Sequence, residues 1–229
     1  MVVIGFNPNE TNGYHWVLMD VNNTRVAKVQ FSGDGSTWNP RIYIEPGHTQ
    51  NLTEITGRGD LILRVTPTNQ PTVNADIGEF LNGEFNTLAY HIMADGNVVV
   101  NNTIAEYPNL RIEAQAATLG NRTIRFTNDL EVKRDMTVDG NSTLLLNTGQ
   151  RGNITVYGNL YIGNWYAGRI LFGTNGTART LTVHGNLISY SDANNRFEVL
   201  NTTQSNLRHR FRIGGDIVQT TGVIDFYTN

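Results

Sequence analysis

The chain has 229 residues, of which 17 are Lys or Arg and 20 are Asp or Glu, so its formal net charge is −3. This balance argues against a nucleic-acid binder, which normally carries a basic excess, and no apolar run approaches the roughly 20 residues of a membrane span. The sequence has no cysteine, which excludes disulfides, thiolate metal sites and cysteine nucleophiles.

The polar composition is unusual, with 29 Asn, 27 Thr and 23 Gly residues. Asn and Gly favour turns, whereas Thr favours strands. This mixture predicts many short strands joined by tight corners, and it argues against a helical bundle.

Residues 1–40 carry no repeat. His15–Val21 and Thr24–Phe31 flank Asn22-Asn23 and are typical of a hairpin. We expect this region to cover the first coil of the structure that follows, because an open solenoid end exposes its core and unpaired strand edges. The first ten residues lack the features of a signal peptide, so the chain is expected to be soluble or a fragment of a longer protein.

From residue 41 onward, an alternating strand, a Gly and Asx corner and an apolar residue recur together. The copies are Ile55–Leu61, Ile92–Val98, Ile124–Leu130, Ile154–Leu160, Leu181–Leu187 and Phe211–Ile217. Their corner residues at 59, 96, 128, 158, 185 and 215 lie 27 to 37 residues apart. A period in this range indicates a repeat architecture.

Each position of the repeat has a physical interpretation. The corner column holds Gly or Asn, which enter left-handed backbone most readily. The next column has short polar side chains that can accept hydrogen bonds from nearby backbone amides. It comprises Asp60, Asn97, Asp129, Asn159, Asn186 and Asp216. With coils about 4.8 Å apart, Asn159 and Asn186 can also bond to each other. The apolar column after it is predicted to stack inside the core.

These features predict an all-β fold, a right-handed parallel β-helix of about six coils. Residues 1–40 form the N-terminal hairpin or cap region, and residues 41–229 form the β-helix, most regular from residue 90. A β-sandwich is the alternative, with Asp95-Gly96 or Asn22-Asn23 as hairpin turns. A sandwich, however, gives no reason for one corner to recur at a steady interval.

Three sequence phrases resemble the "PNL-x-I … GNLTV-x-G" repeats of large Bacteroidota surface proteins. They are Tyr107–Ile112, Asp129-Leu130 with Met136–Asn141, and Gly158–Ile162. The resemblance covers roughly residues 90–229. It implies a β-helical segment of an extracellular or cell-surface, adhesin-like protein of the kind exported by type IX secretion.

The densest aromatic group contains Tyr157, Tyr161, Trp165 and Tyr166. Aromatic faces on the ridged side of a β-helix can stack on sugar rings while their polar tips stay hydrated. We therefore predict these four residues as a glycan-binding group. The alternative is that Trp165 and Tyr166 only fill an irregular loop.

Parallel β-helices also host polysaccharide lyases and glycosidases, so a carbohydrate-active enzyme is the alternative function. Glycoside hydrolysis needs two carboxyl groups roughly 5 to 9.5 Å apart, whereas Asp129 and Asp216 would lie about 14 Å apart. Five other acidic residues fall in different columns with no visible convergence; they are Glu113, Glu131, Asp139, Asp192 and Glu198. The histidines show no metal-ligand spacing. No catalytic residue, metal site or cofactor is predicted.

The favoured function is thus structural or adhesive: a rigid extracellular segment that presents a surface to glycans, cells or neighbouring copies. The stretch Ile224–Tyr227 resembles a strand without a polar cap. We expect the final coil to be open and to stack end to end with another copy or to continue in a longer chain.

Overall fold

A computed structural model gives the architecture of the chain. It describes residues 2–5, 16–19, 22, 27–32, 40–75, 86–93, 97–102, 104, 106–114, 122–146, 152–173, 177–190, 192–199 and 208–226. Every regular element in these ranges is a β-strand. The chain divides into two compact units, Met1–His91 and Ile92–Asn229.

The first unit is built from strands that alternate between two parallel sheets. One sheet has the order β1 (Val2–Gly5), β3 (Ala27–Ser32), β5 (Thr49–Arg58) and β7 (Thr72–Ala75). The other has the order β2 (Trp16–Met19), β4 (Arg41–Ile44), β6 (Asp60–Val65) and β8 (Thr87–Ile92). The chain therefore already winds as a solenoid in this unit.

This arrangement corrects the hairpin predicted within residues 15–31. Strand β2 pairs in parallel with β4, and β3 pairs in parallel with β1 and β5. The two strands lie in different sheets, so they are not partners. Their alternating sequences are compatible with a hairpin and with a solenoid coil, because each of these consists of two strands joined by a turn.

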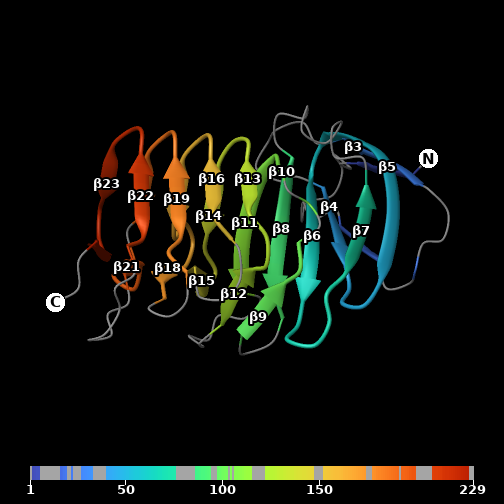
Figure 1. The fold of residues 1–229 in the computed structure, drawn as a ribbon. Helices are drawn as coiled ribbons and strands as arrows, with labels where there is room; N and C mark the ends of the chain where they lie inside the picture. Colours follow the sequence, from blue (N-terminus) through green and yellow to red (C-terminus); the bar gives the residue numbers. More distant parts are fainter. Residues whose placement is uncertain are drawn as a thin grey trace. The chain divides into compact units, whose positions relative to one another are not determined.

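The second unit is a parallel β-solenoid with three sheets. Its first sheet contains β10 (Glu106–Tyr107), β13 (Leu130–Val132), β16 (Ile154–Val156), β19 (Thr180–Val183) and β22 (Arg210–Ile213). Its second contains β11 (Asn109–Ala114), β14 (Met136–Val138), β17 (Leu160–Ile162), β20 (Leu187–Ser189) and β23 (Ile217–Gln219). Figure 1 shows β13, β16, β19 and β22 side by side.

The third sheet closes each coil. It contains β9 (Asn97–Val100), β12 (Thr123–Phe126), β15 (Ser142–Leu146), β18 (Gly168–Phe172), β21 (Arg196–Val199) and β24 (Val223–Asp225). Counting one strand per sheet, β10 to β24 make five coils, which we number one to five. The strands of successive coils pair in parallel throughout the described part of this unit, which confirms the β-helix and not the sandwich.

Equivalent residues of successive coils lie over one another. Leu160 is the Cα partner of Leu187, and Leu187 is the partner of Ile217. The strands expose alternate residues, so inward positions such as Leu160 and Leu187 are completely buried. Side chains that alternate across a strand therefore produce continuous apolar columns inside the solenoid. The predicted inward leucine column is confirmed for these coils.

Two copies of the repeat were placed on the wrong face. In the copy Ile92–Val98, Asn97 and Val98 lie in β9 of the third sheet, where Val98 pairs with Ile124. Ile154 pairs with Leu130, so the counterpart of Ile154–Leu160 is Leu130–Met136 and not Ile124–Leu130. Ile124 lies instead in β12 of the third sheet, where it pairs with Leu144. The two segments share the same alternation of apolar and polar residues, and this alternation does not reveal which sheet a strand joins.

Candidate functional site

The corner between the first and second sheets has the same length in coils two to five, and we call it the ladder corner. Its three-residue connections are 133–135, 157–159, 184–186 and 214–216. The middle residue is Arg134 in coil two and Gly in coils three to five. The last residue of each connection is Asp or Asn. Its side-chain oxygen accepts a hydrogen bond from the backbone N–H of the equivalent residue in the next coil, at 2.7 Å from Asn159 to Asp135 and 2.9 Å from Asn186 to Asn159.

This ladder extends over all five coils, because Asn109 accepts from Asp135 and Asn186 accepts from Asp216. The predicted role of short polar side chains as acceptors for backbone amides is confirmed at this corner for Asn159 and Asn186. Asp129 is not part of the column: it lies before β13 and accepts from the backbone N–H groups of Gly152 and Asn153. Asp135 occupies the place predicted for Asp129, because β13 and not β12 precedes this corner.

The glycines of the ladder corner are required by close approach and not by left-handed backbone. Gly158 and Gly185 have no positive φ angle. A Cβ atom on Gly185 would lie 2.6 Å from the carbonyl oxygen of Gly158 in the coil before. The prediction that this column holds Gly because the backbone is left-handed is therefore wrong. Gly is needed because successive coils lie too close together for a Cβ atom.

Tyr157 lies at the ladder corner with both ring faces next to other side chains. The His184 ring of the following coil stacks on it, with centroids 4.9 Å apart and planes 2° from parallel. The Lys133 ammonium of the preceding coil lies 5.0 Å from the centroid of the Tyr157 ring. Since these neighbours come from the coils on either side, they flank the ring in a stack along the solenoid. Tyr157 is still 45% exposed, so these neighbours leave part of the ring open to solvent.

Lys133 also holds two carboxylates at this corner. Its ammonium lies 2.6 Å from Glu131 and 3.2 Å from Glu106. The hydrogen bond from Lys133 lowers the pKa of Glu131 below its ordinary value, and the same bond raises the pKa of Lys133. The charges of this outer surface are therefore paired with one another.

Tyr161 projects outward from β17 in the second sheet. It stacks on Tyr190 of the next coil at 5.7 Å between centroids, and its hydroxyl accepts a hydrogen bond from Asn159. Burial raises the pKa of Tyr161 above its ordinary value, and the negative charge of Asp135 adds to the effect. Tyr161 thus supports Tyr190, a residue that the sequence pattern did not single out.

The corner between the second and third sheets, which we call the aromatic corner, differs from coil to coil. Its connections are 139–141, 163–167, 190–195 and 220–222 in coils two to five. Between coils three and four it forms a recess of about 160 Å³, the aromatic hollow. The hollow is lined by Gly163, Asn164, Trp165, Tyr166, Tyr190 and Asp192.

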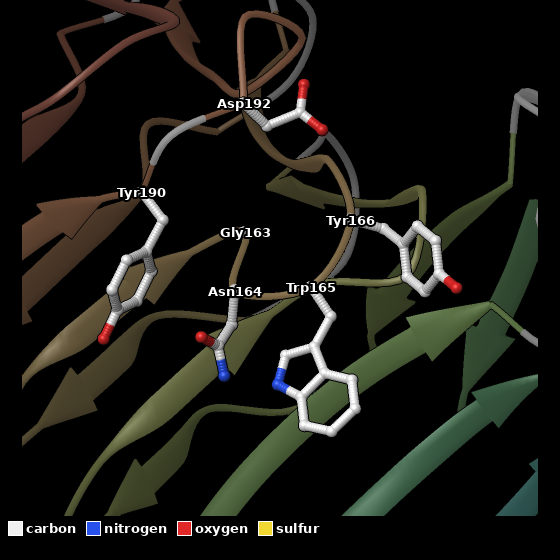
Figure 2. A pocket seen from close by; sticks show the side chains of 6 residues that line it. All are labelled: Gly163, Asn164, Trp165, Tyr166, Tyr190 and Asp192. Atoms are coloured by element: carbon white, nitrogen blue, oxygen red, sulfur yellow. The ribbon is translucent and has the colours of Figure 1, made fainter.

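The aromatic side chains of the hollow are exposed. Trp165, Tyr166 and Tyr190 are 67%, 53% and 38% accessible to solvent. Figure 2 shows Tyr190, Asn164 and Trp165 pointing to the same side of the loop, while Tyr166 points aside. In this view the amide of Asn164 lies between the rings of Tyr190 and Trp165, and all three residues line the hollow. This combination can bind a ring that has flat faces and hydroxyl groups on its edges.

A buried carboxylate holds the loop that carries these rings. The Asp139 side chain has no solvent exposure and accepts hydrogen bonds from the backbone N–H groups of Asn164, Trp165 and Tyr166 at 2.8 to 3.3 Å. The Gly140 N–H also donates to it, and an Arg111 guanidinium nitrogen lies 3.1 Å away. Asp139 comes from the coil before the loop that it holds.

Asn195 fixes the same loop from the following coil. Its side-chain oxygen accepts from the backbone N–H of Gly168, and its amide group donates to the carbonyl oxygens of Ile162 and Tyr190. Gly163 has a φ of +64°, and a Cβ atom there would overlap the Asn195 side chain. The loop is therefore fixed between two buried polar side chains.

The structure brings some acidic residues together that the sequence columns kept apart. Arg111 joins Glu113 to Asp139, and Lys133 joins Glu106 to Glu131. In each pair the carboxylates are bound to a cation, and Asp139 is inaccessible to a substrate. A general acid of a glycosidase instead requires a raised pKa, whereas that of Glu131 is lowered.

The structure distributes the four predicted glycan-binding residues along and around the second sheet. Tyr157 lies at the ladder corner, Tyr161 lies in the sheet, and Trp165 and Tyr166 lie at the aromatic corner. The glycan-binding assignment itself stays a prediction. Tyr190 and Asp192 would have been found by aligning coil four with coil three, because Ile162 pairs with Ser189 and places Tyr190 beside Gly163.

Within the described ranges, no group of three or more His, Asp or Glu side chains is arranged to hold a metal ion. Nor do the described residues form any helix that is long and apolar enough to cross a bilayer. Comparison with protein-family models, with curated proteins and with solved structures found no match to this chain.

Proposed function

We propose that the chain is a rigid β-solenoid segment of an extracellular or cell-surface protein, and that it binds carbohydrate at the aromatic hollow. The extracellular setting rests on the resemblance of residues 90–229 to adhesin-like repeats of surface proteins exported by type IX secretion. The binding role rests on the chemistry of the hollow.

One observation carries the proposal: exposed Trp165 and Tyr190 flank the Asn164 amide in a fixed recess. Contiguous exposed apolar patches mark interaction sites and ligand-binding grooves, and stacked contacts between aromatic rings contribute about 1 kcal/mol each. The Asn164 amide supplies both a donor and an acceptor, which suits the hydroxyl groups of a sugar.

The size of the hollow indicates how much ligand it holds. Its volume of about 160 Å³ is below the roughly 300 to 1,000 Å³ of sites that enclose drug-sized ligands. A recess of this size accommodates one ring, such as a terminal sugar, while the rest of a glycan remains in solvent.

The scaffold around the hollow is suited to an adhesive role. Backbone pairing in three sheets and the ladder of Asx side chains connect each coil of the second unit to the next. A site on such a scaffold needs little ordering when it binds, so less free energy is lost on association.

A glycan array tests the proposal, with Trp165→Ala as the variant and Tyr157→Ala as the matched control. We expect Trp165→Ala to weaken binding about tenfold, the equivalent of about 1.4 kcal/mol, because it removes a free stacking face. Tyr157→Ala should retain binding, because Tyr157 lies at the ladder corner and is not among the residues that line the hollow. Equal loss in the two variants, or no glycan bound by the unmodified chain, would contradict the proposal.

The array is paired with a depolymerisation assay on the same sample. Release of shorter fragments from any bound polysaccharide would favour the carbohydrate-active enzyme, a lyase or glycosidase, over the adhesive segment. Binding without cleavage is the expected result, because the carboxylate pairs near the aromatic residues are bound to Arg111 and Lys133.

Contact with a neighbouring copy is the second candidate role. The observation that favours it is the exposure of apolar side chains in coil five, including Ile217 at 48%. Light scattering at rising concentration tests it. Growth of the particle would support end-to-end stacking, and strictly monomeric behaviour at all concentrations would count against it.

A further inference from the structure

We propose that Asp139 is the positioning residue of the aromatic hollow: its buried carboxylate sets the loop 163–167 in the conformation that binds the ligand. This inference rests on the proposed function. According to this inference, the geometry of the binding loop depends on a residue that does not itself contact the ligand and that belongs to the preceding coil.

The first argument is the convergence of hydrogen bonds. Three consecutive backbone N–H groups, those of Asn164, Trp165 and Tyr166, point to the carboxylate of Asp139. Successive amides that converge in this way form a concave anion site. Here the anion is a side chain of the protein itself, so the backbone of both exposed aromatic residues is fixed.

The second argument is burial. The Asp139 side chain has no solvent exposure, and a buried charge is tolerated only when it is paired and hydrogen-bonded. Arg111 supplies the opposite charge, and the loop amides supply the bonds. Because removal of the carboxylate would leave the three amides without this acceptor, the loop would lose its main anchor.

The third argument comes from the equivalent positions of other coils. The residue that follows the second-sheet strand is Asp139 in coil two, but Gly163, Tyr190 and Thr220 in coils three, four and five. The buried carboxylate thus occurs one coil before the loop that carries Trp165 and Tyr166. It is a local feature of the hollow and not a requirement of the coil.

Asp139→Asn is the test variant, because it keeps the volume of the side chain but removes its charge and one acceptor oxygen. Asp129→Asn is the control, at an exposed carboxylate. Asp129 also accepts from two successive backbone amides, those of Gly152 and Asn153, but it lies away from the hollow at another corner.

Amide hydrogen exchange measured by NMR gives the first readout and needs no ligand. In the unmodified chain the amides of Asn164, Trp165 and Tyr166 should be protected, although the side chains of these residues are exposed. Asp139→Asn should accelerate their exchange at least tenfold, and Asp129→Asn should leave it unchanged. Unprotected amides in the unmodified chain, or unchanged exchange in Asp139→Asn, would overturn the inference.

Affinity for the strongest ligand of the glycan array is the second readout. It should fall at least tenfold in Asp139→Asn and change less than twofold in Asp129→Asn, while circular dichroism shows an intact β-solenoid in both. Faster loop exchange with undiminished affinity would overturn the positioning role. If Asp139→Asn does not fold, the protection measured in the unmodified chain still decides whether the anchor exists. Absence of any glycan binding would defeat the proposed function, whereas the exchange result would still show whether Asp139 anchors the loop.

Discussion

The ladder corner and the aromatic corner belong to the same coils but follow opposite rules. At the ladder corner, coils two to five each use three residues and end in Asp or Asn. At the aromatic corner, the connection has three, five, six and three residues in the same coils. One corner maintains the spacing of the solenoid, and the other is free to carry a site.

The physical reason for the difference is the distance between backbones. At the ladder corner, successive coils approach so closely that only Gly fits at 158 and 185. At the aromatic corner, the chain bulges outward and buried side chains, Asp139 and Asn195, satisfy the backbone groups that the bulge leaves unpaired. The length of a connection can thus vary only where side chains can form the hydrogen bonds that the backbone of the repeat would otherwise make.

Gly185→Ala should have the largest effect on stability. Its Cβ atom would lie 2.6 Å from the carbonyl oxygen of Gly158, and neither backbone can shift without moving a whole coil. We expect the free energy of unfolding to fall by about 2 to 3 kcal/mol, in the range of overpacked cores. Chemical denaturation measures it, with Thr182→Ala on the outer face of β19 as a control near neutral. Equal stability of the two variants would show that close approach does not set the corner.

Replacement of Asp135 tests the ladder itself. Asp135→Ala removes the acceptor for the Asn159 N–H, which lies 2.7 Å away, and should lower the unfolding free energy by about 1 to 2 kcal/mol. Asp135→Asn keeps an acceptor and should cost about 0.5 kcal/mol or less. Denaturation curves of the two variants measure the difference. An equal loss of unfolding free energy in both variants would indicate that the charge of Asp135, and not its hydrogen bond, stabilises the corner.

The pKa of Tyr161 tests the link between the two corners. Burial first, and Asp135 second, raise it above its ordinary value of 10. Because the folded pKa exceeds the unfolded one, this contribution to stability is complete below pH 10 and is lost as the pH rises through the folded pKa. Ultraviolet titration, with Tyr161→Phe to assign the signal, should show a lower pKa in Asp135→Asn that still exceeds 10. An unchanged pKa of Tyr161 in Asp135→Asn would show that Asp135 does not contribute to the shift.

The ion pair of Glu131 and Lys133 should have the smallest effect. The pKa of Glu131 is lowered by Lys133, so its contribution is present above the unfolded value and is lost as the pH falls through the folded pKa. Both side chains are at least one third exposed, so Glu131→Gln should cost less than about 0.5 kcal/mol at neutral pH. Denaturation at neutral and acidic pH measures this, and a loss above about 1 kcal/mol would contradict a solvent-screened pair at this surface.

The sequence was sufficient for the features that repeat. The copies at 154–160, 181–187 and 211–217 predicted the parallel register of three coils, and the pairing of Leu160, Leu187 and Ile217 confirms it. It was insufficient where local patterns are ambiguous. The pattern of residues 16–19 and 27–32 was also compatible with a hairpin, and the pattern of 124–130 resembled that of strands in a different sheet. Both errors arise because the periodicity of a strand identifies its outer face but not its pairing partner.

The candidate site was only partly predictable, because its residues come from different coils. Trp165 and Tyr166 are neighbours in sequence, so composition alone reveals them. Tyr190 joins them through the pitch of the solenoid, and Asp139 joins them through hydrogen bonds to backbone amides. Nothing in the phrase Asp139-Gly140-Asn141 distinguishes an anchor for a distant loop from an ordinary turn.

The most direct test of the claim that the variable corner carries the binding site is an NMR titration with the strongest ligand of the glycan array. Resonances of Asn164, Trp165 and Tyr190 should shift in proportion to occupancy, while those of Asp135, Asn159 and Asn186 at the ladder corner remain in place. Shifts concentrated at the ladder corner, or no glycan able to shift the resonances of the aromatic hollow, would contradict the account.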